Sequence, residues 1–566
     1  MTGDHPNHSI MPELAINGMN NLGTEQDSGK DVKLDQSIPA QSHTNQHHTS
    51  IAPDVSPKEI RTYNLAFSAT CLGIGTVFGS ASTYMTYQIQ QIAYLTVGHN
   101  PGMPPGSGCL SLELPCRVPF GPHDVNLTSL FLFLNAIIFG VSGALTLLIC
   151  GWGDYLPFKR EQYISFTVLY GVLALPVAGL TTYTKSNYTA LIGLYTSFGI
   201  IGFMAGAWQN IFVPYTMHIA APVSKVHEQE NQQDQTDLEF GQNSHTIPTT
   251  EELDEEESRQ LRSLREKEGV KISASGNNAL NIGMTIFYLI TIGLSYANAQ
   301  SSLYAGLYMS TAAGGICISL ALSAWRFLPD PKQTKSSEGA SWLYIPLRTF
   351  LDLWQGMWKY PEAFKFLLAW TIYNDSLFAF SAVTGNLFNL IIRPSLVEFT
   401  CYSLAGTATS IIGSTAFYIL FPRLKYTLRQ WAIVFYSIPT IVCLWCMFGL
   451  NSNSPIGFKD RVEFYIGQIL INLSTAILNC LFRVLFSELF PNGSEIKYFG
   501  FQLVLSLGTV WIPQVVDGPI VDKTNNQRLP SIVAFIFFLV AVFLTWWTDD
   551  KKGIKTALVA SRACQK

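Results

Sequence analysis

An aspartate in the middle of an apolar segment is the residue of this chain most able to do chemistry. The segment from Phe364 to Phe388, FKFLLAWTIYNDSLFAFSAVTGNLF, is long enough to cross a bilayer and carries Asn374 and Asp375 near its middle. About eleven residues at ~1.5 Å each place Asp375 roughly halfway through a ~30 Å hydrocarbon core. A carboxylate at that depth costs about 2.5 to 3.5 kcal/mol and is usually tolerated beside a bundle interior or a water-filled path. We therefore expect either a transport site or a carboxyl group held by neighbouring Ser, Thr or Asn side chains.

The composition identifies the class of protein. Of 566 residues, 48% are hydrophobic and only 13% are charged, and the charged residues gather outside the apolar runs. These values indicate a polytopic membrane protein rather than a soluble one. The net charge of -4 says little about partners, and nucleic acid is not expected among them. The ten cysteines form no CxxC array typical of metal sites, so neither a metal ion nor a cofactor is expected.

A span-length window divides most of the chain into about twelve apolar segments. They lie near 65–92, 127–150, 164–182, 189–213, 278–297, 302–325, 363–390, 401–421, 430–450, 463–485, 498–520 and 530–547. We therefore expect an all-α polytopic membrane protein with two six-helix bundles, 59–326 and 363–548, joined by a cytoplasmic linker, 327–362. Residues 1–58 are rich in Asn, Gln, Ser and His and are expected to form a disordered tail, with a second tail at 549–566. No cleavable signal peptide is visible.

Lysine and arginine are distributed unevenly among the connections. With the N-terminus in the cytoplasm, the inner connections hold more of these residues than the outer ones, as the positive-inside rule requires. Both termini are therefore expected in the cytoplasm. The sequons at Asn126 and Asn187 then fall on the outer side, where both are candidates for glycosylation.

Two connections carry further features. The outer connection GSGCLSLELPCRV places Cys109 and Cys116 where they can close a small loop as a disulfide, with two free thiols as the alternative. The connection 216–270 is polar, and its acidic run 251–257 is followed by arginines. Thr249 begins a capping-box pattern, so a short charged helix is expected there, either solvated or serving as a docking site.

Six plus six spans around a central linker are typical of a secondary transporter of the major facilitator type. The connection GWGDYLPFKR resembles a degenerate form of that superfamily's Gly-x-x-x-Asp loop, whose charges lock helix ends in one conformation. Asp154, Lys159 and Arg160 are therefore candidates for gating. Arg483 and Glu488, at the inner end of the tenth span, are also candidates if each pairs with a loop charge. Snorkelling to the headgroups is the alternative for Arg483.

Four separated segments resemble one family within that superfamily, the autophagy-related vacuolar amino-acid effluxers of fungi. The closest likeness is FLLAWTIYNDS, which ends at Ser376 and contains Asp375. The others are Ser82-Thr83-Tyr84 with Gln90-Gln91 in the first span, KISASGNNALNIG from Lys271, and FRVLFSELFPNGSEIKYFG with GPIVDKTNNQR near the tenth to twelfth spans. Together they cover most of residues 60–548. The chain departs from the pattern at Ile74, where that family usually has an acidic residue.

The resemblance implies a vacuolar membrane transporter that exports amino acids, neutral aliphatic ones such as leucine, from the lumen to the cytosol after autophagic protein breakdown, by alternating access. An amino acid is a zwitterion, so its site needs a partner for the ammonium group and donors for the carboxylate. Asp375 suits the ammonium group, and it can also handle protons that drive export from an acidic compartment. Candidate donors are Asn374, Tyr373, Tyr84, Gln91, Asn278 and Asn281. Each amide has an alternative role in hydrogen bonding between helices, worth about 0.6 to 2 kcal/mol.

Two other classes of function stay open at the level of sequence. The protein is alternatively a non-transporting receptor or scaffold that binds partners through its N-terminal tail and the acidic connection 216–270. A membrane enzyme is the third class. It is disfavoured because the chain has no HExxH, GxSxG or GKS segment.

Overall fold

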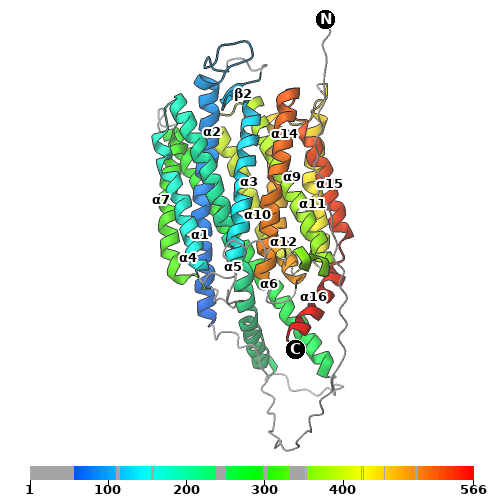
Figure 1. Ribbon diagram of the computed structural model, residues 1–566. Helices are drawn as coiled ribbons and strands as arrows, with labels where there is room; N and C mark the ends of the chain where they lie inside the picture. The colour runs from blue at the N-terminus through cyan, green and yellow to red at the C-terminus, as the bar shows by residue number, and fades with distance from the viewer. Residues whose placement is uncertain are drawn as a thin grey trace, which may run out of the picture. The chain divides into compact units, whose positions relative to one another are not determined.

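Helices make up almost all of the described part of the protein (Figure 1). The computed structural model describes residues 56–109, 115–153, 158–236, 250–297, 304–330, 351, 354–421, 423–424, 426–451, 453–490 and 495–565, which all lie in one unit from 52 to 566. Twelve helices within these residues are long and apolar enough to cross a membrane, which confirms the predicted fold class. Asp154, most of the proposed central linker and most of the proposed N-terminal tail lie outside the described residues.

The first six spans come from the N-terminal half of the chain. Their elements are α1 (Pro57–Val77), η1 (Phe78–Ser82), α2 (Thr83–Ile92), η2 (Ala93–Val97), α3 (Leu127–Gly153), α4 (Lys159–Ala174), η3 (Leu175–Gly179), α5 (Lys185–Thr236), α6 (Thr250–Ala297), α7 (Ala305–Ala324) and η5 (Trp325–Phe327). The first span is therefore one continuous helical run from Pro57 to Val97, longer than predicted, with two π-helical stretches, η1 and η2. Such stretches are rare and often occur at functional sites.

The last six spans come from the C-terminal half. Their elements are α9 (Pro361–Ile391), α10 (Leu396–Leu420), α11 (Leu428–Phe448), α12 (Arg461–Glu488), α13 (Glu495–Thr509), α14 (Trp511–Thr524) and α15 (Pro530–Trp547), followed by α16 (Asp550–Gln565). Capping residues set several starts: Thr427 and Gln430 form a capping box before α11, and Asp460 and Glu463 form one before α12.

The acidic run 251–257 does not form a separate short helix. It lies in the first turns of α6, which continues without a break into the fifth span and is 48 residues long. The reason is composition, because the stretch from the run to the span is rich in Glu, Leu, Arg and Lys and contains no proline. The run is therefore coupled mechanically to a transmembrane helix.

A small hairpin lies at one end of the bundle. Strands β1 (Arg117–Phe120) and β2 (His123–Asn126) pair antiparallel, and Gly121 in the turn has a φ of 62° that a glycine adopts without strain. Cys109 and Cys116 form a disulfide just before β1. Sequence patterns did not indicate these strands, since each has only four residues.

Replacing both Cys109 and Cys116 with Ser should loosen the hairpin. The bridge spans seven positions, so its loss should remove about 2 to 3 kcal/mol of chain-entropy stabilisation locally. Trypsin added on the hairpin side should then cut at Arg117 about ten-fold faster or more, measured by gel or mass spectrometry. Cys401→Ser removes a free thiol elsewhere and should leave the cutting rate unchanged. Equal rates in both variants would rule out a structural role for the bridge.

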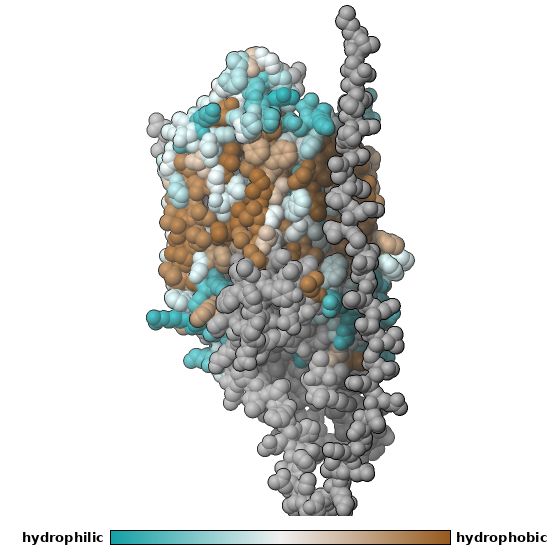
Figure 2. Space-filling view, in the orientation of Figure 1, coloured by the Kyte–Doolittle hydropathy of each residue, from teal (hydrophilic) through white to brown (hydrophobic). Residues whose placement is uncertain are grey.

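The two halves meet along close helix contacts. α6 packs against α10, and α3 packs against α13 and α14. At Gly143 on α3, a Cβ atom would lie only 2.8 Å from the backbone oxygen of Leu507, so the two helices approach as closely as only small residues allow. On the side of the molecule that Figure 2 shows, the described surface between the two ends is mostly apolar and forms a brown band. This arrangement suits a bundle surrounded by lipid.

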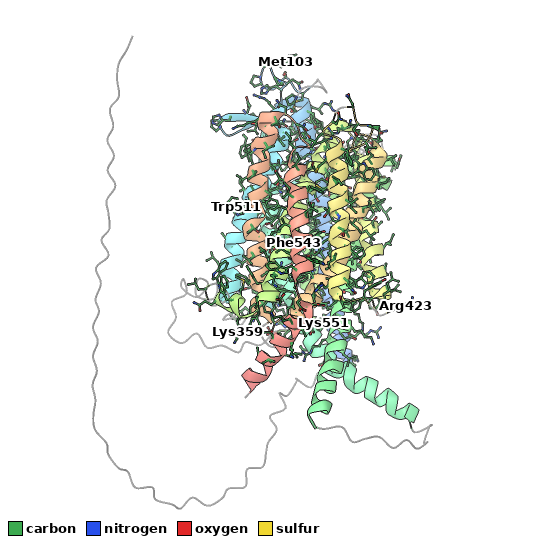
Figure 3. All side chains as sticks on the ribbon, turned by 90° about the vertical axis from the view of Figure 1, so that its right-hand side faces the viewer. Met103, Lys359, Arg423, Trp511, Phe543 and Lys551 are labelled. Carbon is green, nitrogen blue, oxygen red and sulfur yellow. A yellow bond between two sulfur atoms is a disulfide. The ribbon has the colours of Figure 1, made fainter. Side chains whose placement is uncertain are left out.

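Polar residues collect at the two ends of the bundle. We call the end that carries β1 and β2 the hairpin end; Met103 lies there in Figure 3. The opposite end carries Lys359, Arg423 and Lys551 in the same view, and we call it the basic end.

Candidate functional site

A cavity of about 390 Å³ lies between the two halves of the bundle. Six helices line it: α2, α3 and α5 from the first half, and α9, α10 and α12 from the second. Its polar lining residues are Thr83, Thr86, Asn135, Tyr195, Ser381, Asn386, Asn389, Tyr402, Ser403, Gln468, Asn472 and Thr475. The apolar ones are Phe131, Leu377, Ala382, Phe399 and Ile471, with Gly385 completing the wall. We call this space the central cavity.

The π-helical stretch η1 ends immediately before the first-span residues of the central cavity. Thr83 and Thr86 follow it on α2, and Thr83 Oγ1 lies 3.1 Å from the hydroxyl of Tyr288 on α6. On the facing side, Tyr195 donates to Oδ1 of Asn135 at 3.0 Å and so joins α5 to α3. These bonds fix the walls that the first half contributes.

Amide side chains dominate the walls from the second half. Asn472 and Gln468 lie one turn apart on α12, and Asn472 Nδ2 donates to the backbone oxygen of Gln468 at 2.8 Å. Both amides lie beside Gly406 of α10, where a Cβ atom would come within 2.8 Å of Gln468 Nε2. On α9, Oδ1 of Asn389 is buried without a hydrogen-bond partner among the described residues. An acceptor left in this state is available to a ligand or to water.

Asp375 lies close to the central cavity but does not line it. At 3.6 residues per turn it shares a face of α9 with Ala382 and Asn386, about two turns nearer the basic end. Oδ1 of Asp375 is buried and has no hydrogen-bond partner among the described residues, although Thr509 of α13 lies beside the carboxyl group. The carboxyl group therefore lies between α9 and α13, nearer to the basic end than the central cavity.

Three phenylalanines from three helices form a cluster, one of them three residues after Asp375 on α9. Phe378 of α9 has its ring centroid 5.2 Å from Phe139 of α3, and Phe139 lies 4.9 Å from Phe203 of α5. The cluster joins the two halves within a few residues of Asp375.

The structure does not gather the other predicted donors around Asp375. Tyr373 is fully buried against Tyr436 and Phe538, with ring centroids at 4.6 and 5.7 Å, so it packs inside the second half instead of facing the cavity. Asn281 donates to the backbone oxygen of Asn277 at 2.8 Å within α6. Asn374 is half-buried beside Tyr373.

Two of the predicted donors instead connect the two halves. Tyr84 has its hydroxyl 3.2 Å from Oγ1 of Thr400 on α10. Asn278 of α6 donates to Oγ1 of Thr415 at 3.1 Å and accepts from Ser414, both on α10. Gln91 is half-buried near the end of α2. None of these three residues lines the central cavity.

Sequence reasoning missed a second buried carboxyl group, that of Asp517. The Asp-Gly-Pro run at 517–519 is typical of a turn, but α14 continues through Pro519 to Thr524. The interruption falls earlier, at Val510, because Pro513 lacks the N–H that would bond to the carbonyl of Thr509. Asp517 is 1% exposed and its Oδ1 has no partner among the described residues.

Gln514 increases the polarity around Asp517. It lies one turn away on α14, is 0% exposed, and has neither amide atom hydrogen-bonded among the described residues. Buried polar groups without partners cost about 1 to 3 kcal/mol each, so a cluster of them calls for water, a proton or a ligand. The only sequence signal was an aspartate and a glutamine inside a span-length apolar segment.

The predicted gating residues have different surroundings. Arg483 of α12 donates to Oγ of Ser273 on α6 at 3.0 Å, which ties the two halves together near the basic end. Arg160 pairs with its neighbour Glu161 at 2.9 Å, a contact within α4 and not between helices. Lys159 is buried at the start of α4, and Glu488 is the last residue of α12.

Removing the hydroxyl partner of Arg483 should make the basic end easier to open. Ser273→Ala leaves the half-buried guanidinium of Arg483 without this acceptor, and a hydrogen bond to a charged group is worth about 1.5 to 3 kcal/mol. Cys71, which is fully buried beside Arg483 and accepts from Gln209, reports opening. Its labelling by a maleimide from the basic side should rise about ten-fold.

The control for this labelling is Ser319→Ala, because the hydroxyl of Ser319 bonds only to the backbone oxygen of Gly315 in its own helix α7 among the described residues. The rate of Cys71 labelling in Ser319→Ala should equal the rate in wild type. An unchanged rate in Ser273→Ala would mean that the Arg483 contact does not hold the halves together.

The two glycosylation candidates differ in accessibility. Asn126 ends β2, is 4% exposed, and accepts from the backbone of Thr128, so the folded chain leaves little room for a glycan. Asn187, near the start of α5, is half-buried and donates to Thr182. Glycosylation at both sites stays a prediction.

Comparison with known protein families identifies the family to which this chain belongs. A family model described as vacuole effluxer Atg22 like matches residues 56–558. The chain belongs to the Atg22-like family. Autophagy-related protein 22 of Candida albicans is 25% identical over 490 residues, which are 85% of this chain and 88% of that protein. The Candida glabrata protein is 22% identical over 458 residues, 75% of this chain and 76% of that protein. The match to the Kluyveromyces lactis protein, 26% over 212 residues, spans 43% of that relative.

Solved structures show the fold of this Atg22-like protein. The human organic anion transporter MFSD10 has a TM-score of 0.50 and 11% identity, over 87% of this chain and all of that one. The major facilitator transporter FucP in its outward conformation has a TM-score of 0.50 and 14% identity, over 86% and all of it. The predicted family and major facilitator fold are thus confirmed. The Atg22-like chain is a multi-pass membrane protein whose family and fold are those of transporters of small molecules.

Proposed function

We propose that this protein exports neutral amino acids, with leucine as the representative substrate, from the vacuole lumen to the cytosol after autophagic protein breakdown. The observation that best supports this proposal is the central cavity between the two halves. None of its described lining residues carries a charge, while amides and hydroxyls surround it. A solute with a net charge would be left uncompensated there, whereas a zwitterion with no net charge can satisfy both of its charged groups with dipoles.

The lining of the cavity suits both ends of such a substrate. Amide N–H groups of Asn472 and Gln468 can donate to a carboxylate, and the unpartnered Oδ1 of Asn389 can accept from an ammonium group. Leu377 and Ile471 offer an apolar surface for an aliphatic side chain. A volume of about 390 Å³ lies within the range of small-molecule sites.

Alternating access requires the two halves, 59–326 and 363–548, to move against each other around the cavity. Contacts between the halves lie at both ends: Asp522 Oδ1 accepts from the backbone of Asn126 at 3.1 Å at the hairpin end, and Arg483 bonds to Ser273 at the other. We propose that these contacts break in turn. The hairpin end faces the lumen in this proposal, because the inner connections hold more lysine and arginine than the outer ones, among them Lys359, Arg423 and Lys551 at the basic end, and because a disulfide suits an oxidising compartment.

Asp375 is our candidate for proton handling, with Asp517 as its partner on the lumenal side. Both carboxyl groups are buried inside membrane-spanning helices and have an oxygen without a partner. The family usually has an acidic residue at the position of Ile74, and this chain has none there. Ile74 packs in the core of the first half. Coupling through two acids of the second half is therefore the arrangement that the residues support.

Flux measurements in reconstituted liposomes test this function. Labelled leucine should accumulate in a saturable way, and excess valine or isoleucine should compete while lysine and aspartate do not. A non-transporting receptor would give no flux above empty vesicles. Equal competition by lysine would contradict the argument from the uncharged cavity.

A further inference from the structure

A second space opens at the basic end, on the side of the bundle that faces the lipid. Two connected clefts of about 430 and 590 Å³ share Ser68, Lys271 and Ser275 as lining residues. The first cleft is bounded by α1, α5 and α6, and the second by α1, α6, α7 and α10. No residue of either cleft lines the central cavity. We call the first cleft the polar cleft and the second the apolar groove.

The polar cleft has a net positive charge. Its charged lining residues are Arg61, Lys271 and Glu268, which sum to +1. Lys271 pairs with Glu268 at 3.4 Å, and Arg61 forms no ion pair within the described part of the chain. Asn64 adds a buried oxygen, Oδ1, without a partner among the described residues. The cleft thus offers a cation to a phosphate and an acceptor to a hydroxyl or ammonium group.

The apolar groove runs from Lys271 along α6 toward Ile282. Those eleven positions at ~1.5 Å each give about 16 Å, close to half of a ~30 Å hydrocarbon core. Aliphatic side chains form most of its walls, including Leu65 and Leu72 of α1 and Leu320 of α7. Leu65 and Ile282 are exposed on the outer surface, so the groove opens sideways.

We propose that the two clefts bind one anionic phospholipid from the leaflet at the basic end. Its phosphate lies between Arg61 and Lys271, its polar head group reaches Asn64, and one acyl chain follows the groove beside α6. The charge of the cleft, the polarity change at Ser68 and Ser275, and the length of the groove each match such a lipid. Basic pockets between transmembrane helices are a known mode of anionic head-group binding.

The position of the bound lipid predicts its effect on the arrangement of the two halves. α6 and α10 form a large contact between the two halves, and Thr415 and Tyr418 of α10 line the groove opposite α1. An acyl chain there touches both halves at once. The bound lipid therefore stabilises one arrangement of the halves, whatever solute the central cavity carries.

Lipid retention by the purified full-length protein tests the site. The protein is delipidated in detergent, given an equimolar mixture of phosphatidylserine and phosphatidylcholine, and analysed by native mass spectrometry. Wild type should retain phosphatidylserine at least ten-fold over phosphatidylcholine. The double variant Arg61→Ala with Lys271→Ala should lose this preference, and Arg61→Lys with Lys271→Arg should keep it.

Matched variants control for charge and for folding. Lys551→Ala with Lys552→Ala removes two exposed cations at the same end and should keep the preference. Ile282→Trp should block the groove and lower retention, whereas Ile286→Trp, one turn further on α6 and outside the groove, should not; the two positions are 41% and 42% exposed. Thermal melting identifies variants that fail to fold.

Three results would overturn the proposal. Equal retention of both lipids by wild type would remove the anionic preference. An equal effect of the Lys551 and Lys552 substitutions would mean that surface charge alone attracts the lipid. Displacement by millimolar inorganic phosphate, with no effect of Ile282→Trp, would assign the cleft to a free anion.

Discussion

Gly385→Phe should abolish transport while leaving the fold intact. Gly385 lines the central cavity, and a Cβ atom built on it would meet nothing within 4 Å. A phenyl ring there fills space that the substrate would occupy. Replacing a glycine in the interior of α9 by phenylalanine also slightly favours the helix, because glycine is about 1 kcal/mol less favourable than alanine and phenylalanine at most about 0.7 kcal/mol less favourable. Leucine flux in liposomes should fall at least ten-fold, equivalent to ~1.4 kcal/mol or more at the barrier.

A matched glycine lies outside the cavity. Gly293 on α6 is exposed and also has nothing within 4 Å of a built Cβ atom. Gly293→Phe adds the same ring toward the surroundings of the bundle and should transport like wild type. Normal flux in Gly385→Phe, or an equal loss in both variants, would show that the central cavity is not the transport path.

Asp375→Asn should remove the response of transport to lumenal acidity. If a proton must bind Asp375 before the loaded carrier turns over, wild-type export should speed up as the lumenal side is acidified. The amide keeps the shape of the side chain but exchanges no proton, so flux should be low at every pH, by about ten-fold or more at the wild-type optimum. The measurement is leucine export from vesicles at several internal pH values with a fixed external pH.

Asp460→Asn is the matched control for this substitution. Asp460 caps the start of α12 near the hairpin end, and asparagine caps helices about as well as aspartate. Its pH profile should follow that of wild type. Asp517→Asn should resemble Asp375→Asn if the two acids share one proton path. A wild-type profile in Asp375→Asn would assign its carboxyl group a structural role only.

Sequence reasoning recovered the spans because length and hydropathy are set locally. Each span needs about twenty apolar residues, and that requirement is visible without knowing any neighbour. It also found Asp375, since a charge inside such a run is conspicuous. The π-helical stretch at Phe78–Ser82 was not predictable in the same way, because its residues are ordinary for a membrane helix.

The site could not be assembled from sequence because it depends on which face each helix turns inward. Tyr373 and Asp375 are two positions apart, yet Tyr373 packs against Tyr436 within one half while Asp375 lies near α13. Asn472 and Gln468 line the cavity, but as amides in a span they were indistinguishable from interhelical packing residues. Asp517 was missed because Asp-Gly-Pro is typical of a turn, whereas α14 continues through Pro519.

The π-helical stretch in the first span has a consequence for comparing this chain with its relatives. A π-turn holds one residue more than the α-helical turn it replaces, and each residue of an α-helix advances the face by about 100°. Deleting a single residue within Phe78–Ser82 would therefore convert this wide turn into an ordinary α-helical turn, while Thr83 and Thr86 keep their place in the wall of the central cavity. A one-residue gap at this point of an alignment marks the loss of the π-turn in that relative, with the same cavity-lining positions still comparable.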